Sequence, residues 1–328
     1  MEAERFLVTG ALGCIGAWAV RRLLEEGTQV WTYDLPGSEH RLRLVLRDDQ
    51  LERVRRISGD ITDQAAFERA VADNRITHVV HLAGLQVPFV RADPVQGARV
   101  NVVGTTIVFE TVRRAAGQVR GLSYASSLGV YGPPDLYPPG PLGHDAPLRP
   151  PTLYGVFKQA NEGTAAIYWQ EHGIASVGLR PYVVYGPGRD QGMTSTPTKA
   201  MLAAAIGRPY HISYGGRAVF QHAADAAAAF VRAARHAGRG APVYNLGGSS
   251  ATMAEIVAAI EAAAPAARGA ITFEPVQLPN PEDVDSAALD AALGPIGWVP
   301  LAEGVRRTVE HFRAAAEAGR VDVERAIA

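Results

Sequence analysis

The sequence predicts an α/β fold built on a doubly wound parallel sheet, with a smaller lobe at its C-terminal end. Two observations support this prediction. Short apolar runs alternate with segments of helical apolar spacing over roughly the first 180 residues. A glycine-rich turn joins the first apolar run to the first helical segment. The chain has 328 residues, 47% of them hydrophobic, so a large core with an appended lobe is expected.

The individual elements follow from apolar spacing and from the residues that end each run. Residues 5–9 are apolar and stop at glycine, which is typical of a buried strand. Residues 14–26 place apolar side chains at helical spacing, and Gly27 follows as a C-terminal glycine. Further strands are predicted at 29–33, 54–58, 77–82, 119–125 and 175–179, and further helices at 63–73, 94–116 and 152–171.

Composition and charge exclude several classes of protein. The formal net charge is −1, without the clustered basic excess of a nucleic-acid-binding surface. No apolar run approaches the roughly 18 residues that cross a bilayer, and an apolar strand follows Met1 almost at once. Cys14 is the single cysteine, so no internal disulfide is expected. We therefore expect a cytoplasmic protein with neither a nucleic-acid nor a membrane partner.

The turn after the first strand has the spacing of a dinucleotide-binding loop. Gly10, Gly13 and Gly16 form a G-x-x-G-x-x-G pattern that includes Cys14 and Ile15. The N-terminus of the following helix offers free N–H groups and a positive dipole end to a pyrophosphate, and glycine permits close approach. The pattern predicts a Rossmann-like fold, although an ordinary glycine-rich turn has the same composition.

Two carboxylates follow the next strands. Asp34 ends the second strand, where a carboxylate accepts bonds from the adenosine ribose and repels a 2′-phosphate, so NAD is expected rather than NADP. The alternative role for Asp34 is to cap the next turn. Asp60 can meet the adenine amine or cap the helix that begins near Asp63, and its spacing does not separate these roles.

A tyrosine and a lysine stand four residues apart on the long predicted helix. Tyr154 and Lys158 share one face of that helix. A free tyrosine has a pKa of about 10, and a nearby ammonium stabilises the phenolate and lowers that pKa. Tyr154 can then exchange a proton with a substrate hydroxyl while hydride leaves the same carbon. An ordinary surface helix can carry the same spacing.

Serines at the end of the fifth strand indicate a substrate contact. Ser126 and Ser127 follow the apolar run that ends at Ala125. Strand ends on the carboxyl side of such a sheet line the ligand crevice, so a serine here can hydrogen-bond the substrate oxygen beside Tyr154. A serine-rich turn is the alternative interpretation.

In this order, the motifs resemble the extended short-chain dehydrogenase/reductase family, in its NAD-dependent epimerase/dehydratase branch. The resemblance covers most of the chain. It is carried by TGALGCIG at 9–16, Asp34, GDI at 59–61, HLAG at 81–84, NVVGT at 101–105, SSLGVYG at 126–132, Tyr154 with Lys158, LRP at 179–181, VYGPG at 184–188, Asp225, YNLG at 244–247 and Gly297-Trp298.

The resemblance implies a role for each matching position. Ser127, Tyr154 and Lys158 would be the catalytic residues, with Lys158 also binding the nicotinamide ribose. Asn101 would lie near an active-site water, and the helices around 97–115 and 153–171 would form a homodimer. Contacts with NAD would come from Gly10, Gly13, Cys14, Ile15, Gly16, Asp34, Asp60, Ile61, Leu82, Ala83, Gly84, Asn101, Tyr154, Lys158, Pro181 and Val184.

The chain departs from the family pattern where reaction and substrate are decided. Leu128 and Gly129 replace the acid and base that a dehydratase needs, and no decarboxylase glutamate is present in that region. Sugar-nucleotide members bind their diphosphate with an Asn where Val183 stands and with an Arg where Ala218 stands. Arg217 can replace that arginine only in a shifted register. A small substrate without a nucleotide is therefore expected.

Other polar residues are substrate candidates. Arg189 follows the sixth strand and can bind a carboxylate, the hydroxyls at 194–196 stand nearby, and Gln86 can reach a substrate hydroxyl. Each can equally be part of a loop. Ser126, Ser127 and Val183 complete the substrate set. His222 and Asp225 are expected to make structural hydrogen bonds, and no cluster has metal-site spacing, so no metal is expected.

Three functions follow from these observations. The first is an NAD-dependent dehydrogenase for a secondary alcohol of a small sugar, sugar acid or hydroxy acid. The second is an NAD-dependent UDP- or dTDP-sugar epimerase, which uses the same residues but keeps its cofactor. The third, a dinucleotide sensor without catalysis, has no need of Ser127, Tyr154 and Lys158. We expect residues 1–180 to form the NAD-binding domain, with segments near 219–247 returning to it, and 181–328 to form mainly the substrate-binding lobe.

Overall fold

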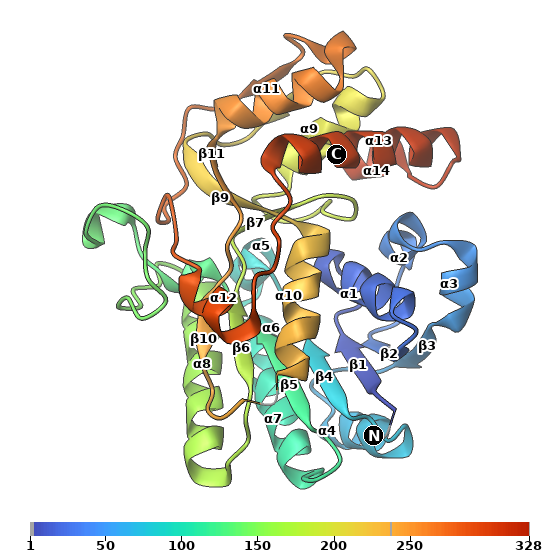
Figure 1. Ribbon diagram of the computed structural model, residues 1–328, viewed down its shortest axis with the longest axis vertical. Helices are drawn as coiled ribbons and strands as arrows, with labels where there is room; N and C mark the ends of the chain where they lie inside the picture. The colour runs from blue at the N-terminus through green and yellow to red at the C-terminus, as the bar shows by residue number, and fades with distance from the viewer. Residues whose placement is uncertain (1–2, 237, 328) are drawn as a thin grey trace.

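A seven-stranded sheet forms the centre of the computed structural model, which describes residues 3–236 and 238–327 (Figure 1). All of its strand pairs are parallel, in the order β10-β6-β5-β4-β1-β2-β3. The predicted doubly wound parallel sheet is therefore confirmed. The strands are β1 (Arg5–Thr9), β2 (Gln29–Asp34), β3 (Arg55–Ser58), β4 (His78–His81), β5 (Gly121–Ala125), β6 (Val177–Arg180) and β10 (Val243–Asn245).

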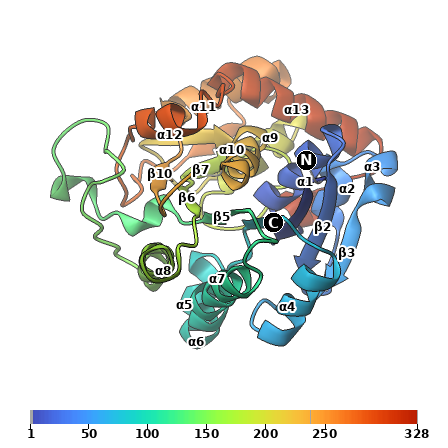
Figure 2. The same ribbon diagram turned by 60° about the horizontal axis from the view of Figure 1, so that its bottom comes forward.

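Helices cover both faces of this sheet (Figure 2). One face carries α1 (Cys14–Glu25) and α10 (Ala223–Arg235), which pack against each other through a core that includes Leu23 and Phe230. The other face carries α4 (Gln64–Asp73), α7 (Gly104–Arg114) and α8 (Leu153–His172). Both faces of the strands are thus buried, which explains why they read as continuous apolar runs.

The connections contain elements that the sequence did not predict. The expected helix at 94–116 is divided into α6 (Pro94–Ala98), a π-helical turn (Arg99–Val103) and α7. Three helices of six residues were missed because each is too short to show helical periodicity. They are α2 (His40–Val45), α3 (Asp48–Arg53) and α5 (Val87–Ala92).

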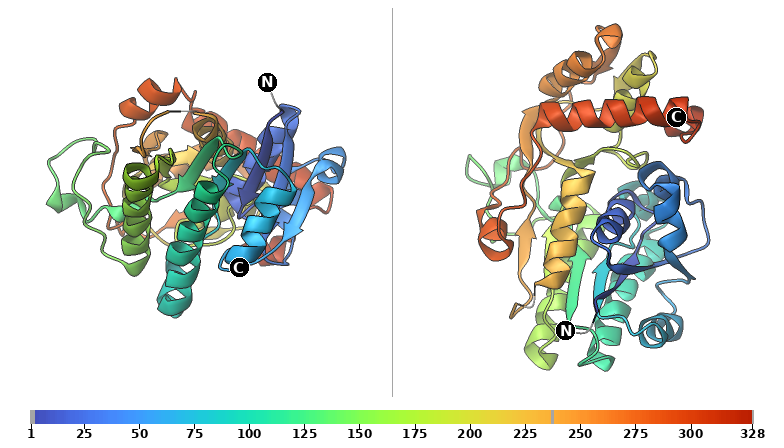
Figure 3. Two further views of the ribbon diagram at one scale, coloured as in Figure 1. Left: turned by 90° about the horizontal axis from the view of Figure 1, so that it is seen from below. Right: turned by 45° about the vertical axis from the view of Figure 1, so that its right-hand side comes forward.

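The C-terminal elements gather at the end of the sheet to which the parallel strands point (Figure 3). They have their own apolar core, which includes Met201, Ile256 and Phe312. They comprise β7 (Val183–Tyr185), β9 (Arg217–His222) and β11 (Ser249–Thr252) in one small sheet, β8 (Tyr210–Ile212) and β12 (Ile271–Phe273) in another, and α9 (Thr196–Ala205), α11 (Met253–Ala263), α13 (Leu301–Glu317) and α14 (Val323–Ile327).

The chain crosses between the two parts more than once. Helix α10 and strand β10 return to the main sheet, where β10 pairs with β6. Helix α12 (Ala287–Leu293) contacts β10. Strand β9 lies within the segment expected to return, but it pairs with β7 and β11 in the small sheet instead. Over the described ranges, none of the helices has both the length and the apolar composition needed to cross a membrane.

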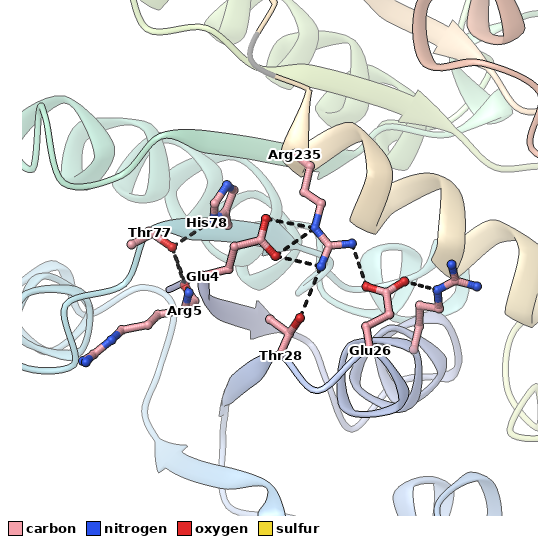
Figure 4. A network of polar contacts seen from close by, with 8 residues as sticks. Glu4, Arg5, Glu26, Thr28, Thr77, His78 and Arg235 are labelled. Atoms are coloured by element: carbon pink, nitrogen blue, oxygen red, sulfur yellow. Dashed lines mark hydrogen bonds and ion pairs between the residues drawn. The ribbon is translucent and has the colours of Figure 1, made fainter. Parts of the chain in front are cut away.

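Arg235, at the end of α10, contacts three other elements near the amino ends of the strands (Figure 4). The Arg235 guanidinium donates to Glu4 at 2.8 Å, to Glu26 at 2.6 Å and to Thr28 at 3.3 Å. Its central carbon also lies 5.2 Å from the centre of the Phe6 ring. One side chain therefore links the starts of β1 and β2 to the end of α1.

We expect Arg235→Gln to lower the free energy of unfolding by about 1–2 kcal/mol, because several partly exposed contacts and a cation–π contact are lost together. The measurement is urea denaturation at low and high salt, since screening should reduce the difference. Arg306→Gln, which removes ion pairs from the exposed face of α13, is the matched control and should have a smaller effect. Equal losses for both variants would contradict the linking role of Arg235.

Candidate active site

A cavity of about 890 Å³ lies at the carboxyl ends of the main-sheet strands. Its walls come from the loops that follow β1, β2, β3, β4, β5 and β6. The C-terminal lobe contributes residues that include Leu278, Asn280 and Arg325. Open α/β sheets bind their ligands at this place, and the volume suits a bound dinucleotide with a small substrate.

The glycine loop forms one wall, and two of its glycines are required by the fold of the loop itself. Gly10 has φ +70°, and a Cβ there would lie 2.6 Å from the backbone nitrogen of Ala83. A Cβ on Gly16 would lie 2.2 Å from the Gly10 carbonyl oxygen. The loop therefore packs onto the end of β4. It presents the first turn of α1, whose N–H groups have no partner within the helix, to the cavity.

Asp34 connects this loop with the end of β2, where it lines the cavity. Its carboxylate accepts hydrogen bonds from the backbone N–H groups of Ala11 at 3.0 Å and Leu12 at 3.3 Å. Burial raises the pKa of Asp34 to about 7, even though these two hydrogen bonds lower it. The side chain lines the cavity at the end of β2, so it fits the predicted contact with the ribose hydroxyls.

The structure separates the two roles considered for Asp60. Its carboxylate accepts from the backbone N–H of Thr62 at 2.9 Å and from the Thr62 hydroxyl at 2.8 Å. Helix α4 is capped by Asp63, which accepts from the backbone N–H of Ala66. Asp60 therefore shapes a turn beside the cavity, next to Ile61, and does not cap the helix.

Tyr154 and Lys158 lie on one face of α8, as predicted, and line the cavity. The Lys158 ammonium donates to the Ala125 carbonyl oxygen at 2.7 Å and lies 5.7 Å from the centre of the Tyr154 ring. Burial lowers the pKa of Lys158 to about 8, against the opposing charge of Glu162. A Cβ on Gly129 would lie 3.4 Å from the Ser127 hydroxyl oxygen and 3.6 Å from the Tyr154 ring, so the three predicted catalytic residues are adjacent.

The electrostatics of Tyr154 differ from the sequence-based expectation. Burial raises the pKa of Tyr154, while the Ser127 hydrogen bond and the charge of Arg189 lower it. The sequence predicts that Lys158 provides the lowering charge, but its ammonium is directed to a backbone carbonyl. Arg189 therefore supplies a cation that acts on the phenol.

A buried ion pair between Arg180 and Glu162 lies next to the catalytic candidates. Arg180 donates two hydrogen bonds to Glu162, at 2.7 and 2.8 Å, and both side chains are at most 8% exposed. The Ser126 hydroxyl also donates to Glu162, and Arg180 reaches the His144 carbonyl oxygen at 2.6 Å. The hydroxyl of Ser126 is thus committed to Glu162 and is not free for the substrate contact that the sequence suggested.

Most of the residues predicted as site residues line this one cavity. They are Gly10, Gly13, Cys14, Ile15, Gly16, Asp34, Asp60, Ile61, Leu82, Ala83, Gly84, Gln86, Ser126, Ser127, Tyr154, Lys158, Pro181, Val184 and Arg189. Burial raises the pKa of the Cys14 thiol to about 12, so this side chain stays neutral.

Three predicted residues lie elsewhere. The Asn101 amide is buried and bonds the backbone N–H and carbonyl oxygen of Leu85, so it holds a turn. Val183 is fully buried in the core of the C-terminal lobe. The Arg217 guanidinium lies 3.4 Å from the Ser250 carbonyl oxygen and 3.8 Å from a Glu255 oxygen, and it does not line the cavity.

His222 and Asp225 make the structural hydrogen bonds that were expected. The His222 ring accepts from the backbone N–H of Ala224 at 3.3 Å, and Asp225 accepts from the backbone N–H of Val299 at 2.8 Å. Within residues 3–236 and 238–327, no three His, Cys, Asp or Glu side chains are placed to hold a metal ion together.

Sequence reasoning missed a contact that joins the glycine loop to the loop that carries Arg189. Arg41, on the unpredicted helix α2, donates to the Leu12 carbonyl oxygen at 2.9 Å and pairs with Asp190 at 2.6 Å. His40 bonds the same carboxylate at 2.7 Å. The partners are about 150 residues apart in the chain, so no local pattern signals their contact. The contact holds the Arg189 loop against the glycine loop.

Comparison with known proteins gives matches over most of the chain. The profile of the NAD dependent epimerase/dehydratase family matches residues 6–247. A UDP-glucose 4-epimerase of Mycolicibacterium smegmatis is 35% identical over 326 residues, which cover 94% of this chain and 98% of that protein. The predicted family is confirmed by this match, and NAD is confirmed as the cofactor of the family.

Solved structures share the fold. The UDP-glucose 4-epimerase of Thermus thermophilus, in complex with NAD, is 29% identical with a TM-score of 0.78, covering 95% of this chain and 99% of that one. An L-threonine dehydrogenase from Clostridium difficile has a TM-score of 0.81 at 20% identity, covering 98% and 100%. The second likeness supports the fold alone.

The raised pKa of Asp34 leads to a prediction about both stability and cofactor binding. The folded state holds a proton on Asp34 up to about pH 7, whereas the unfolded state loses it near 3.8. The free energy of unfolding contributed by this group therefore falls as pH rises between these values. We expect Asp34→Asn to stabilise the cofactor-free protein at pH 8 by at least about 1 kcal/mol, and much less at pH 4.

At pH 8, where Asp34 is charged, the same variant should bind NAD about tenfold more weakly and lose part of its preference over NADP, since a ribose acceptor charge is removed. Cofactor titration and urea denaturation at both pH values measure these effects. Asp63→Asn, outside the cavity, is the control. An Asp34→Asn protein with unchanged NAD affinity and unchanged preference would remove Asp34 from the ribose contact.

Proposed function

We propose, from the premise that this chain belongs to the NAD dependent epimerase/dehydratase family, that it is a dehydrogenase for a small polyhydroxylated substrate. It transfers hydride between NAD and a secondary alcohol or the corresponding ketone. The observation that carries the proposal is that Ser127, Tyr154 and Lys158 line one cavity together, and that the glycine loop and Asp34 line the same cavity.

The side chains of the site have complementary tasks in this reaction. Tyr154 accepts the proton of the substrate hydroxyl, and Ser127 holds the same oxygen. Arg189 brings positive charge to the phenol and opposes in part the effect of burial on the pKa of Tyr154, while Lys158 lies 5.7 Å from the centre of the Tyr154 ring. NAD, when bound, supplies the hydride acceptor. The hydroxyl proton thus goes to Tyr154, and the hydride of the carbinol carbon goes to the bound cofactor.

The surroundings of the cavity favour a substrate without a nucleotide. Val183 and Ala218, at the two positions where sugar-nucleotide binding would require polar side chains, are buried in the lobe core. The nearest basic alternative, Arg217, extends toward Glu255 and not toward the cavity. A diphosphate would therefore lack the polar contacts that sugar-nucleotide members provide at these two positions.

A second candidate is a sugar-nucleotide epimerase. The observation that favours it is the 35% identity to a UDP-glucose 4-epimerase along nearly the full length of both chains. That reaction uses the same tyrosine and serine, but hydride returns to the substrate and the cofactor stays bound. The two candidates therefore differ in whether reduced cofactor is released.

The division of the chain and its association are also proposals. We assign residues 1–180 mainly to NAD binding and 181–328 mainly to substrate binding. Homodimer formation through the helices around 97–115 and 153–171 is supported by the exposed apolar side chains of Val103, Leu153, Val156 and Ile167. Light scattering of the protein in solution tests the dimer, and a monomer at all concentrations would exclude it.

We expect the absorbance of reduced nicotinamide to rise when the protein and NAD meet a suitable sugar, aldonate, uronate or hydroxy acid. UDP- and dTDP-sugars are assayed alongside, with chromatography of the products. Release of reduced cofactor with a small substrate supports the dehydrogenase. Interconversion of nucleotide-sugar isomers without such release would establish the epimerase instead.

Tyr154→Phe should lower turnover about 10²- to 10⁴-fold, the range of general acid–base catalysis, while leaving NAD affinity within about twofold. Tyr168→Phe is the matched control, because Tyr168 lies on the same helix but contacts Glu110 away from the cavity. Turnover that survives in Tyr154→Phe would refute the proton-transfer role.

A further inference from the structure

Buried polar atoms without a partner are concentrated at the substrate end of the cavity. Across the described residues, nine buried side-chain atoms have no hydrogen-bond partner. Four of these atoms are Gln86 Oε1, Arg189 Nε and the hydroxyls of Tyr182 and Tyr214. Folded proteins satisfy most buried polar groups, so such a concentration indicates that a ligand completes them.

Three of these four side chains share one cavity. Gln86, Tyr182 and Arg189 all line the cavity. A Cβ on Gly192 would lie 2.0 Å from Gln86 Oε1 and 3.3 Å from Arg189 Nη2, so both groups pack against the same glycine. Tyr214 belongs to the apolar core of the C-terminal lobe, and Tyr182 packs against that core. Tyr154 lines the same cavity as Gln86, Tyr182 and Arg189, and the charge of Arg189 lowers its pKa. The cluster therefore adjoins the proposed catalytic tyrosine.

Among the described residues, Arg189 has a neutral hydrogen-bond partner but no carboxylate partner. It donates to the Thr194 hydroxyl at 3.0 Å, which is a neutral partner. The adjacent carboxylate, Asp190, is taken by Arg41 and His40. In the part of the chain that the structure describes, no carboxylate forms an ion pair with Arg189. Its guanidinium charge is therefore available to a ligand.

We propose that Gln86, Tyr182, Arg189 and Tyr214, called here the acid subsite, bind a carboxylate of the substrate, which makes the substrate a hydroxy acid. This inference rests on the proposed dehydrogenase function. The carboxylate lies against Arg189 Nε and the Tyr182 hydroxyl, with Tyr214 behind them, and Gln86 Oε1 accepts a hydrogen bond from a substrate hydroxyl. The oxidised carbon then lies in the same cavity as the carboxylate, because Arg189 and Tyr154 both line it.

The charge balance of the cavity favours a carboxylate over a phosphate ester. A single guanidinium with neutral tyrosine hydroxyls matches one negative charge and a planar group. A phosphate carries close to two charges and calls for a second cation. Lys158 is directed to the Ala125 carbonyl oxygen, and Arg41 is paired with Asp190, so neither supplies it. The two other arginines of the cavity lining, Arg91 and Arg325, are exposed to solvent, which screens their charges.

The test compares acids with neutral compounds of the same carbon skeleton on the NAD-loaded protein. The pairs are gluconate with glucitol, galactarate with galactitol and glycerate with glycerol, and glucose 6-phosphate is added as the phosphate probe. Two readouts are taken for each compound: the melting temperature of the NAD-loaded protein and the formation of reduced cofactor. We expect at least one acid to be preferred about 100-fold over its neutral partner in kcat/KM, with the larger rise in melting temperature.

Arg189→Met should remove this preference and lower kcat/KM for the acid about 100-fold or more, with NAD affinity unchanged. Arg189→Lys should restore part of it, because the charge returns without the planar fork. Arg306→Met, on the exposed surface of α13, is the control for loss of an arginine.

Gln86→Glu provides a second test that does not depend on loss of folding. It places a carboxylate beside Arg189, so it should raise the melting temperature of the protein and abolish acid binding together. Acid binding that survives in Gln86→Glu and in Arg189→Met would overturn the acid subsite.

The remaining outcomes separate this inference from the proposed function. If neutral polyols are oxidised as well as their acids, the dehydrogenase stands and the acid subsite falls. A preference for glucose 6-phosphate, or no response to any acid, also overturns the subsite. If only a nucleotide sugar is interconverted, without release of reduced cofactor, both the subsite and the dehydrogenase are refuted.

Discussion

The site depends on the buried ion pair between Glu162 and Arg180. These two side chains join α8 to the end of β6, and the pair also binds the Ser126 hydroxyl and the His144 carbonyl oxygen. Taking two charges out of water costs free energy, which their mutual attraction and hydrogen bonds offset. Removing one partner leaves an unpaired buried charge and typically lowers the free energy of unfolding by about 3–5 kcal/mol. It therefore sets the position of α8, with Tyr154 and Lys158, relative to Ser127.

This arrangement explains how a buried phenol can serve as an acid and base. Burial excludes water and raises the pKa of Tyr154, which alone would keep the phenol protonated. Ser127 and the charge of Arg189 act on this pKa in the opposite direction, and Glu162 helps Lys158 to remain charged. Because Arg189 reaches both the phenol and the acid subsite, an anionic ligand would alter the field at Tyr154. Binding and proton transfer are thereby connected.

The sequence predicted much of the fold because buried parallel strands and long amphipathic helices leave a periodic pattern, as at residues 5–9 and 152–171. Motif spacing likewise identified residues of which most line the cavity. The short helix α2 and the Arg41–Asp190 contact left no periodic signal. Arg217 could not be placed without knowing the pairing of β9, and Tyr182 and Tyr214 resembled ordinary core aromatics. The roles of Lys158 and Arg189 toward Tyr154 depended on side-chain directions that no spacing encodes.

A dehydrogenase of the proposed kind uses NAD as a co-substrate that enters and leaves the site. The most direct measurement needs no knowledge of the substrate: the protein is loaded with labelled NAD, mixed with excess unlabelled NAD, and the bound label is followed over time. The protein should exchange its cofactor freely, and after purification it should carry less than one equivalent. NAD that is retained stoichiometrically and does not exchange would contradict the account and favour an epimerase.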